Sequence, residues 1–139
     1  MTPKPFAWIL AFVLLIVAAV AGCDPVSNDT LVTSTPFIIR VDSITHTPFA
    51  ALSDTIRVKL YGTVGFDGCH SFLRLDTAQA PLQFDITAWG SRSSATVCPM
   101  NVPVLGGLET KTVATQMGWF RIIVHQPDGT TLRDSLIIK

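Results

Sequence analysis

The sequence predicts an all-β fold, a single antiparallel β-sandwich of about seven or eight strands. Apolar and polar residues alternate in several short runs, and turn-forming residues separate these runs. After residue 36, no segment carries the apolar stripe and the capping residues of a helix. A two-residue period buries one face of each strand and leaves the other in water, as in an antiparallel sheet. An N-terminal segment of different composition precedes the predicted sandwich.

Eight segments read as strands. In four of them, apolar residues occupy every second position, so that one face of each strand is expected to be buried. These four are 37–42, 56–61, 82–89 and 120–125. Shorter strands are predicted at 72–76, 95–98, 110–115 and 135–139.

Turn signals lie between these segments. The sequence QPDG at 126–129 predicts a tight hairpin, because proline sets the first turn angle and glycine accepts positive φ. GTVGFDG at 62–68 and WGSRSS at 89–94 predict two further breaks.

The N-terminal segment contains much of the apolar excess of the chain. Only 14% of the 139 residues are charged, against about 25% in an ordinary soluble domain. Residues 6–22 contain no charge at all, and Lys4 makes the start of the chain basic. A basic start, an apolar run and small residues are the three parts of an export signal.

The segment ends in Val20-Ala21-Gly22-Cys23, which resembles the lipobox of bacterial lipoprotein precursors. The resemblance implies a signal peptide over 1–22 that is cut before Cys23, a diacylglycerol on the Cys23 thiol and an acyl chain such as palmitate on the new amino terminus. It also implies a lipid-anchored chain in the cell envelope, facing the periplasm or the exterior. An uncleaved N-terminal membrane helix is the alternative. Either interpretation places the rest of the chain outside the cytoplasm.

Two regions are expected after the signal peptide. Residues 23–36 are polar, contain two prolines and lack an apolar period, so they predict a flexible linker behind the lipid. Residues 37–139 form the predicted sandwich domain.

The cysteine count fits an oxidising compartment. With lipid on Cys23, Cys69 and Cys98 remain as an even pair, and a disulfide between them is the simplest expectation. A metal or redox site is the alternative, but there is no Cys-x-x-Cys spacing, and the adjacent Cys69 and His70 are not spaced to close on one ion.

The end of the chain carries a second resemblance. Gly118, one residue and then the aromatic Phe120 open a strand that a turn connects to the last one. This pattern is similar to the final two strands of immunoglobulin-like and fibronectin-type modules, and it implies an immunoglobulin-like sandwich. Phe120 lacks the hydroxyl of the tyrosine corner, and the two cysteines depart from the immunoglobulin spacing.

Catalysis has little support in the sequence, and we predict no enzyme and no cofactor. The three histidines, His46, His70 and His125, are scattered, and the only glutamate, Glu109, lies in a predicted loop. A carboxylate pair of Asp76 and Asp85 across a hairpin is the remaining option, but solvated strand residues explain both better. A copper site, for which His70, His125, Met100 and Met117 supply the right donors, is not required by their spacing, so no metal is predicted. A net charge of zero argues against nucleic acid as a partner.

Apolar residues on the predicted wet faces indicate a partner-binding face. If Phe120 points inward, then Trp119, Arg121 and Ile123 point outward, and Trp89 has the outward register of its own strand. Tryptophan and arginine are typical of interface cores. The alternatives are that a loop at 101–108 covers this face or that the register slips by one residue.

Together these observations predict a non-catalytic, lipid-anchored binding or structural module of the cell envelope, with an envelope protein or a glycan as partner. A second hypothesis is an inhibitor or accessory subunit of an envelope enzyme, with loops at 64–69 or 102–107 inserted into the partner. A small envelope hydrolase is the third.

Overall fold

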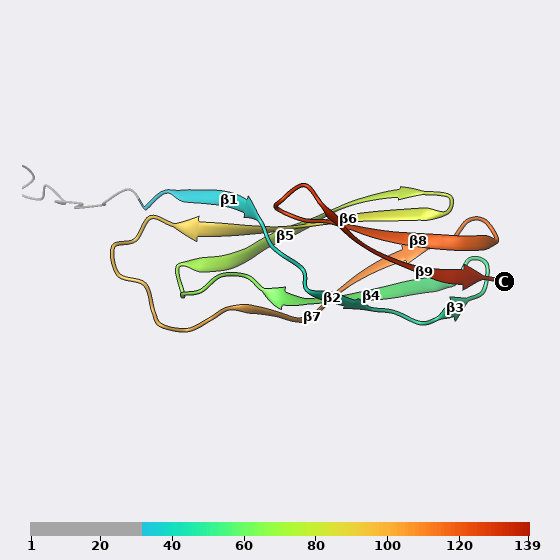
Figure 1. Ribbon diagram of the computed structural model, residues 1–139, viewed down its shortest axis with the longest axis horizontal. Coiled ribbons are helices and arrows are strands. Elements are labelled where there is room, and N and C mark those ends of the chain that lie inside the picture. Colours follow the sequence, from blue (N-terminus) through green and yellow to red (C-terminus); the bar gives the residue numbers. More distant parts are fainter. Residues whose placement is uncertain (1–31) are drawn as a thin grey trace, which may run out of the picture. The chain divides into compact units, whose positions relative to one another are not determined.

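The computed structural model describes residues 32–139. The predicted signal peptide, Cys23 and most of the predicted linker lie outside the described residues. Strands and their connections make up this part of the chain, which confirms the all-β prediction (Figure 1). In the described part, no helix is long and apolar enough to cross a membrane. The strands are β1 (Ser34–Ile38), β2 (Ser43–Thr45), β3 (Phe49–Ala50), β4 (Thr55–Thr63), β5 (His70–Ala80), β6 (Gln83–Ser93), β7 (Val104–Val113), β8 (Gly118–His125) and β9 (Thr131–Ile138).

The larger sheet is built around β6. One edge of β6 pairs with β5 along nearly its full length. The other edge pairs with β8 through its first residues and with β1 through its last ones. Beyond β8 follow β9 and then the short β3.

This sheet is mixed, so the prediction of a purely antiparallel sandwich is wrong in this respect. β8 runs parallel to β6, and β3 runs parallel to β9. Parallel neighbours need a long crossover connection. The chain supplies one by passing through β7, which belongs to the second sheet, between β6 and β8.

The smaller sheet has the strand order β2-β4-β7 and is antiparallel. Glu109, predicted to lie in a loop, is a strand residue of β7, where its carboxylate lies 2.6 Å from the Arg57 guanidinium of β4. The first half of this strand could not be predicted, because Gly106 and Gly107 interrupt the alternation of apolar and polar residues. They lie opposite β4 where its pairing register shifts, between Leu60 and Tyr61.

The core lies between the two sheets, and the alternation predicted its members well. Phe37 and Leu82, on the predicted inward register, are half-buried. The other inward residues of the four clearest segments are buried: Ile39, Val41, Ile56, Val58, Leu60, Phe84, Ile86, Ala88, Phe120, Ile122 and Val124. The predicted hairpin at 126–129 is also present and contributes a buried polar group. The Gln126 amide accepts a hydrogen bond from the Val41 N–H (3.1 Å) and donates one to the Val41 carbonyl (2.8 Å). This pair of bonds ties the hairpin to the segment that follows β1.

Four predicted boundaries are wrong. The strand expected at 37–42 ends at Ile38, and residues 39–42 connect it to β2. The break expected at 89–94 is instead the end of β6, because strands pair with both of its edges there. The strand expected at 95–98 is part of the connection to β7, where Cys98 is held by a covalent link rather than a ladder. The linker expected up to residue 36 ends earlier, since β1 begins at Ser34. Pro36 is tolerated in β1 because this strand pairs along one edge only.

Candidate functional site

An exposed aromatic row crosses the outer face of the larger sheet. Trp119 of β8 lies opposite Ile137 of β9, and Ile137 lies opposite Phe49 of β3. Directly paired residues project from the same side of a sheet. Trp119 is 68% exposed and Phe49 61% exposed, with Ile137 half-buried between them. We call Trp119, Ile137 and Phe49 the aromatic row.

The alternation of β8 explains why Trp119 faces outward. Its neighbour Phe120 is fully buried, so the register predicted for this strand is confirmed. Arg121 is exposed and Ile123 half-buried on the same outer face. Trp119, Arg121 and Ile123 therefore lie on one face as the sequence predicted, and no loop from 101–108 covers it, because residues from Val104 onward belong to β7 of the other sheet.

Cationic side chains border the aromatic row. The Lys139 ammonium lies 5.6 Å from the centroid of the Phe49 ring. Arg121 is opposite Ser135, and Arg133 is opposite Ile123. Among residues 32–139, none of these three cations takes part in an ion pair. The row is thus an apolar surface bordered by cations that form no ion pair within the described residues.

Sequence reasoning missed two members of the row. Phe49 lies in β3, which has only two residues and so shows no alternation, and its partner Ile137 lies in a predicted strand whose outward residues had no known neighbour. Only the parallel pairing of β3 with β9 brings them together. The apolar, weakly charged composition of the chain is the one sequence signal that pointed to such a surface.

Trp89 lies apart from the row. It pairs with Arg74 of β5 and with Ile38 of β1, in the half of β6 that does not touch β8. The Arg74 guanidinium lies 5.3 Å from the centroid of the Trp89 ring and donates hydrogen bonds of 2.9 and 3.2 Å to Asp76. Trp89 is therefore half-buried beneath a side chain of its own sheet.

The structure does not pair the two aspartates that were considered for catalysis. Asp76 is opposite Thr87, and Asp85 is opposite Ala78. The hydrogen bond from Arg74 holds the pKa of Asp76 below its ordinary value. A general acid needs a raised pKa, so this carboxylate is unsuited to the role.

The histidines and methionines do not gather into one site. Each histidine faces a different aspartate: His46 Nε2 lies 3.0 Å from Asp134, His70 Nδ1 2.7 Å from Asp67 and His125 Nε2 3.2 Å from Asp85. Met100 lies in the connection from β6 to β7, whereas Met117 precedes β8 at the other end of the sheet.

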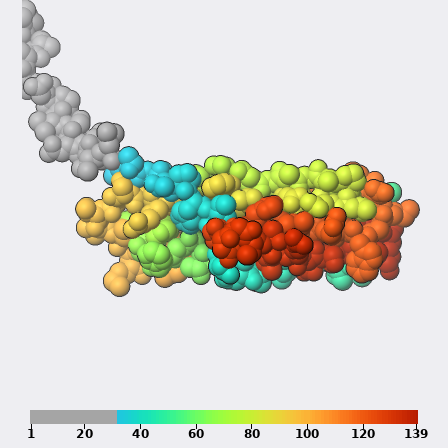
Figure 2. All heavy atoms as spheres, turned by 45° about the horizontal axis from the view of Figure 1, so that its top comes forward, coloured from blue at the N-terminus to red at the C-terminus, as the bar shows by residue number. Residues whose placement is uncertain are grey.

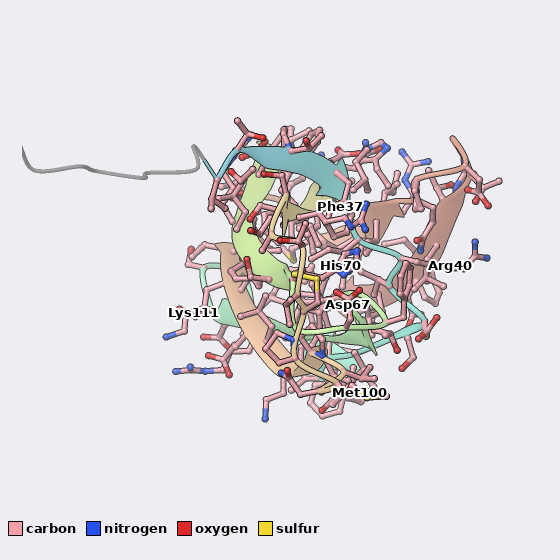
Figure 3. The ribbon with its side chains drawn as sticks, turned by 90° about the vertical axis from the view of Figure 1, so that its left-hand side faces the viewer. Phe37, Arg40, Asp67, His70, Met100 and Lys111 are labelled. Carbon is pink, nitrogen blue, oxygen red and sulfur yellow. A yellow bond between two sulfur atoms is a disulfide. The ribbon has the colours of Figure 1, made fainter. Side chains whose placement is uncertain are left out.

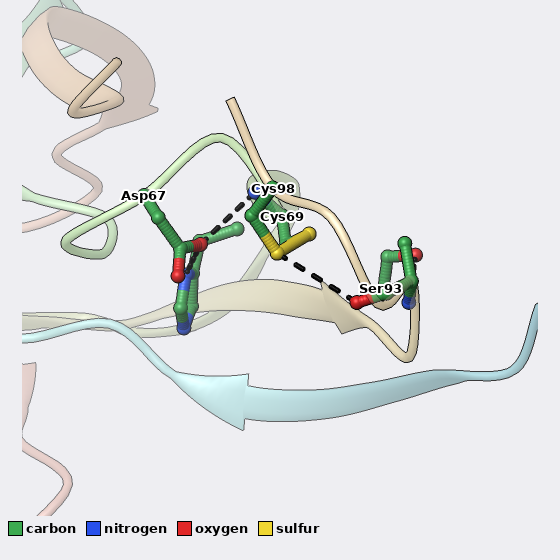
Figure 4. Close-up of a disulfide and its surroundings, with 6 residues drawn as sticks. Asp67, Cys69, Ser93 and Cys98 are labelled. Atoms are coloured by element: carbon green, nitrogen blue, oxygen red, sulfur yellow. Dashed lines mark hydrogen bonds and ion pairs between the residues drawn. A yellow bond between two sulfur atoms is a disulfide. The ribbon is translucent and has the colours of Figure 1, made fainter. Parts of the chain in front are cut away.

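The predicted disulfide is present and joins two loops. Cys69 and Cys98, separated by 29 residues, link the connection at 64–69 with the connection at 94–103. The Ser93 N–H donates to the Cys69 carbonyl (2.8 Å), and the Gly68 N–H donates to the Pro99 carbonyl (2.7 Å). Figure 4 shows the disulfide with Asp67 on one side of it and Ser93 on the other. We call these two connections the loop end of the sandwich.

Asp67 organises the first of these loops. One of its carboxylate oxygens accepts hydrogen bonds from the Cys69 N–H (3.0 Å) and from the His70 ring (2.7 Å). Burial acts to raise the pKa of Asp67, but the bonds from His70 and Cys69 outweigh it and the pKa is lowered. Asp67 and the two cysteine sulfurs lie within 4.8 Å of one another. Because the sulfurs are bonded to each other, neither offers a thiolate to a metal ion.

A cavity of about 620 Å³ opens beside the loop end. Its wall is mostly apolar and includes Phe37, Val64 and Phe66, with Arg92 as a polar member. The His70 ring also lines it and packs edge-on against Phe37, with ring centroids 5.6 Å apart. Figure 3 shows Phe37, His70 and Asp67 gathered near the disulfide, with Met100 away from them at the periphery.

No protein-family model, curated protein or solved structure matches the chain. The aromatic row and the loop end are therefore the two candidate binding surfaces of the described residues.

Proposed function

We propose that the protein is a lipid-anchored, non-catalytic binding module of the bacterial cell envelope that holds its partner on the aromatic row. The observation that carries the proposal is that Trp119 and Phe49 are both exposed, on either side of Ile137, on the outer face of one sheet. Contiguous apolar patches on small proteins mark interaction sites, and tryptophan and arginine dominate their energetics.

The positive charge around the row indicates which chemical class of partner fits it. Arg121, Arg133 and Lys139 have no carboxylate partner within the described residues. A partner that presents an apolar group among carboxylates satisfies both features of this surface. An acidic envelope protein is the first candidate, and an acidic glycan stacked on Trp119 is the second.

The lipid anchor is supported by the leader and its Cys23 junction, and by the disulfide, which suits an oxidising compartment. Two or three acyl chains hold a protein stably on a membrane, since each buried CH₂ contributes about 0.8 kcal/mol.

The row is accessible in an anchored protein. Val32, the first described residue, precedes β1 at the loop end, whereas β3 and the ends of β8 and β9 that carry the row lie at the opposite end (Figure 1). β6 has 11 residues, a length of roughly 36 Å. A partner could therefore reach the row without contacting the bilayer.

Affinity capture with a Trp119→Ala variant tests the partner site. The lipidated full chain would be used to capture proteins and glycan fragments from envelopes of the cells that produce it, at low and high salt. The wild-type chain is expected to retain a stoichiometric partner that Trp119→Ala loses and that high salt weakens. Trp89→Ala is the matched control, because the same residue type on the same face lies under Arg74. Thermal unfolding of both variants is measured in parallel, and a large stability loss in Trp119→Ala without any change in captured partner would refute the site.

Replacement of Cys23 tests the anchor. Cys23→Ser is expected to abolish the diacylglycerol mass on the chain, to leave the precursor uncut and to prevent lipid-dependent membrane partitioning. Mass spectrometry of the membrane and soluble fractions reads out each effect, and normal processing of the variant would contradict lipidation.

A further inference from the structure

The loop end exposes a group of apolar side chains that the partner site does not use. Phe66 of the first loop is 77% exposed. In the second loop, Val97 is 85% and Met100 100% exposed, and Val102 is exposed as well. The disulfide and the bond from Gly68 to Pro99 hold the two loops side by side. The apolar tips therefore lie on two joined loops at the same extremity of the sandwich, the end at which Figure 2 shows residues 94–103.

This extremity is nearly free of charge. The segments 32–39, 63–69 and 93–108 contain a single charged residue, Asp67. Its carboxylate is already engaged by His70 and Cys69. Arg92, at the end of β6, is exposed beside these segments. The opposite extremity differs, since Asp54, Arg121 and Lys139 accompany its exposed apolar residues.

The same extremity is where the chain enters the sandwich. Only residues 24–31 separate Cys23 from Val32. A chain of this length reaches about 30 Å when fully extended and spans roughly 17 Å as a flexible coil. A lipid on Cys23 would therefore keep the loop end at a high effective concentration next to the bilayer.

The loops need little ordering before they can bury their tips. The bonds from Cys69 to Asp67 and from Ser93 to Cys69 hold the backbone of the first loop, and the disulfide and the bond from Gly68 to Pro99 tie the second loop to it. A preorganised surface loses less conformational entropy on binding than a mobile one.

From these observations we infer that the loop end is a membrane-contact surface, with Phe66, Val97 and Met100 inserted at the boundary between lipid headgroups and acyl chains. This inference rests on the proposed lipid anchor. The insertion depth is about 5–10 Å, as for other interfacial apolar surfaces. Arg92 then lies at the height of the headgroups, where a cation meets anionic lipid. The aromatic row points away from the membrane.

Quenching of tryptophan fluorescence by lipid tests the inference. Met100→Trp and, as the matched control, Met117→Trp are made in the full chain, which is purified with its lipid and reconstituted in vesicles of phosphatidylethanolamine and phosphatidylglycerol. Both methionines are exposed, but Met117 lies at the other end of the sandwich. With brominated acyl chains in the vesicles, the added fluorescence of Met100→Trp is expected to be lost, and that of Met117→Trp to remain. The wild-type chain, cut before Cys23 and therefore without Trp8, supplies the common background of Trp89 and Trp119.

Vesicle flotation separates the two proposals. A lipidated chain that floats with the vesicles while both added tryptophans are quenched equally, or not at all, overturns the membrane contact and leaves the anchor intact. A chain without diacylglycerol on Cys23 that does not float overturns both. A chain that floats with selective quenching at residue 100 supports both.

Discussion

At the scale of single residues, the space around two glycines separates positions that tolerate a side chain from positions that do not. A Cβ on Gly65 would overlap the His70 ring, whereas a Cβ on Gly106 would meet nothing within 4 Å. Gly65 lines the cavity and lets the first loop pass directly over His70. The sequence alone could not tell these glycines apart, because each belongs to a glycine-containing stretch that reads as a turn.

Gly65→Ala is therefore expected to destabilise the fold by about 1–3 kcal/mol, the usual cost of overpacking a tight site. Gly106→Ala is the control and should change the free energy of unfolding by under about 0.5 kcal/mol. Urea denaturation of both variants measures the difference. Equal midpoints would contradict the prediction, because they would show that the loop shifts to accommodate the Cβ without destabilising the fold.

The lowered pKa of Asp67 makes a second prediction at this scale. A carboxyl whose pKa is lower in the folded than in the unfolded state contributes stability above its ordinary pKa, here 3.8. This contribution is lost as the pH falls through the lower, folded value. Asp67→Asn should reduce the stability of the fold at neutral pH, and the stability of this variant should fall less than that of the wild-type chain as the pH is lowered. Thermal unfolding of the wild-type and variant chains between neutral pH and the acid range measures this, and parallel curves would contradict it.

At the scale of elements, the two-residue period predicted which residues of a strand face the core, but it did not predict which strands pair with each other. It assigned most inward residues of the four clearest segments correctly, because burial on one face imposes that period on the sequence. One of these segments, 37–42, is a strand only as far as Ile38. The period failed for the first half of β7, where Gly106 and Gly107 interrupt the pattern. Nor could it give the parallel pairing of β6 with β8, since partner choice depends on the path of the chain between the sheets.

The disulfide is the element-scale feature that the sequence did predict, from an even count of cysteines in an exported chain. Its sequence separation of 29 residues corresponds to a loop-closure contribution of about 3.6 kcal/mol in the chain-entropy model. The double variant Cys69→Ala with Cys98→Ala should lose stability of this order in denaturant unfolding. Adding reductant should destabilise the wild-type chain and leave the variant unchanged. A loss much smaller than about 1 kcal/mol would mean that the hydrogen bonds at the loop end suffice to join the loops.

At the scale of the whole molecule, the sandwich separates two unlike surfaces. The strands hold the aromatic row at one end and the apolar, almost uncharged loops at the other (Figure 1). The sequence predicted Trp119, Arg121 and Ile123 from their register, but Phe49 and Phe66 lie outside alternating runs. Their positions follow only from the folded chain, because β3 joins the edge of β9 and the disulfide joins the two loops.

This separation predicts that the two proposed contacts are energetically independent. Groups more than about 10 Å apart without shared partners act additively, and the length of β6 places the two surfaces roughly 36 Å apart. Trp119→Ala should therefore abolish partner capture and leave the quenching of Met100→Trp by lipid unchanged. Val97→Lys, made in the chain that carries Met100→Trp, should reduce this quenching, because it places a charge among the inserted side chains, and should leave partner capture unchanged. Quenching and capture measured on the single and combined variants give the coupling between the surfaces. Loss of partner capture in Val97→Lys at unchanged thermal stability would mean that the loops contact the partner, as an inhibitor or accessory subunit would.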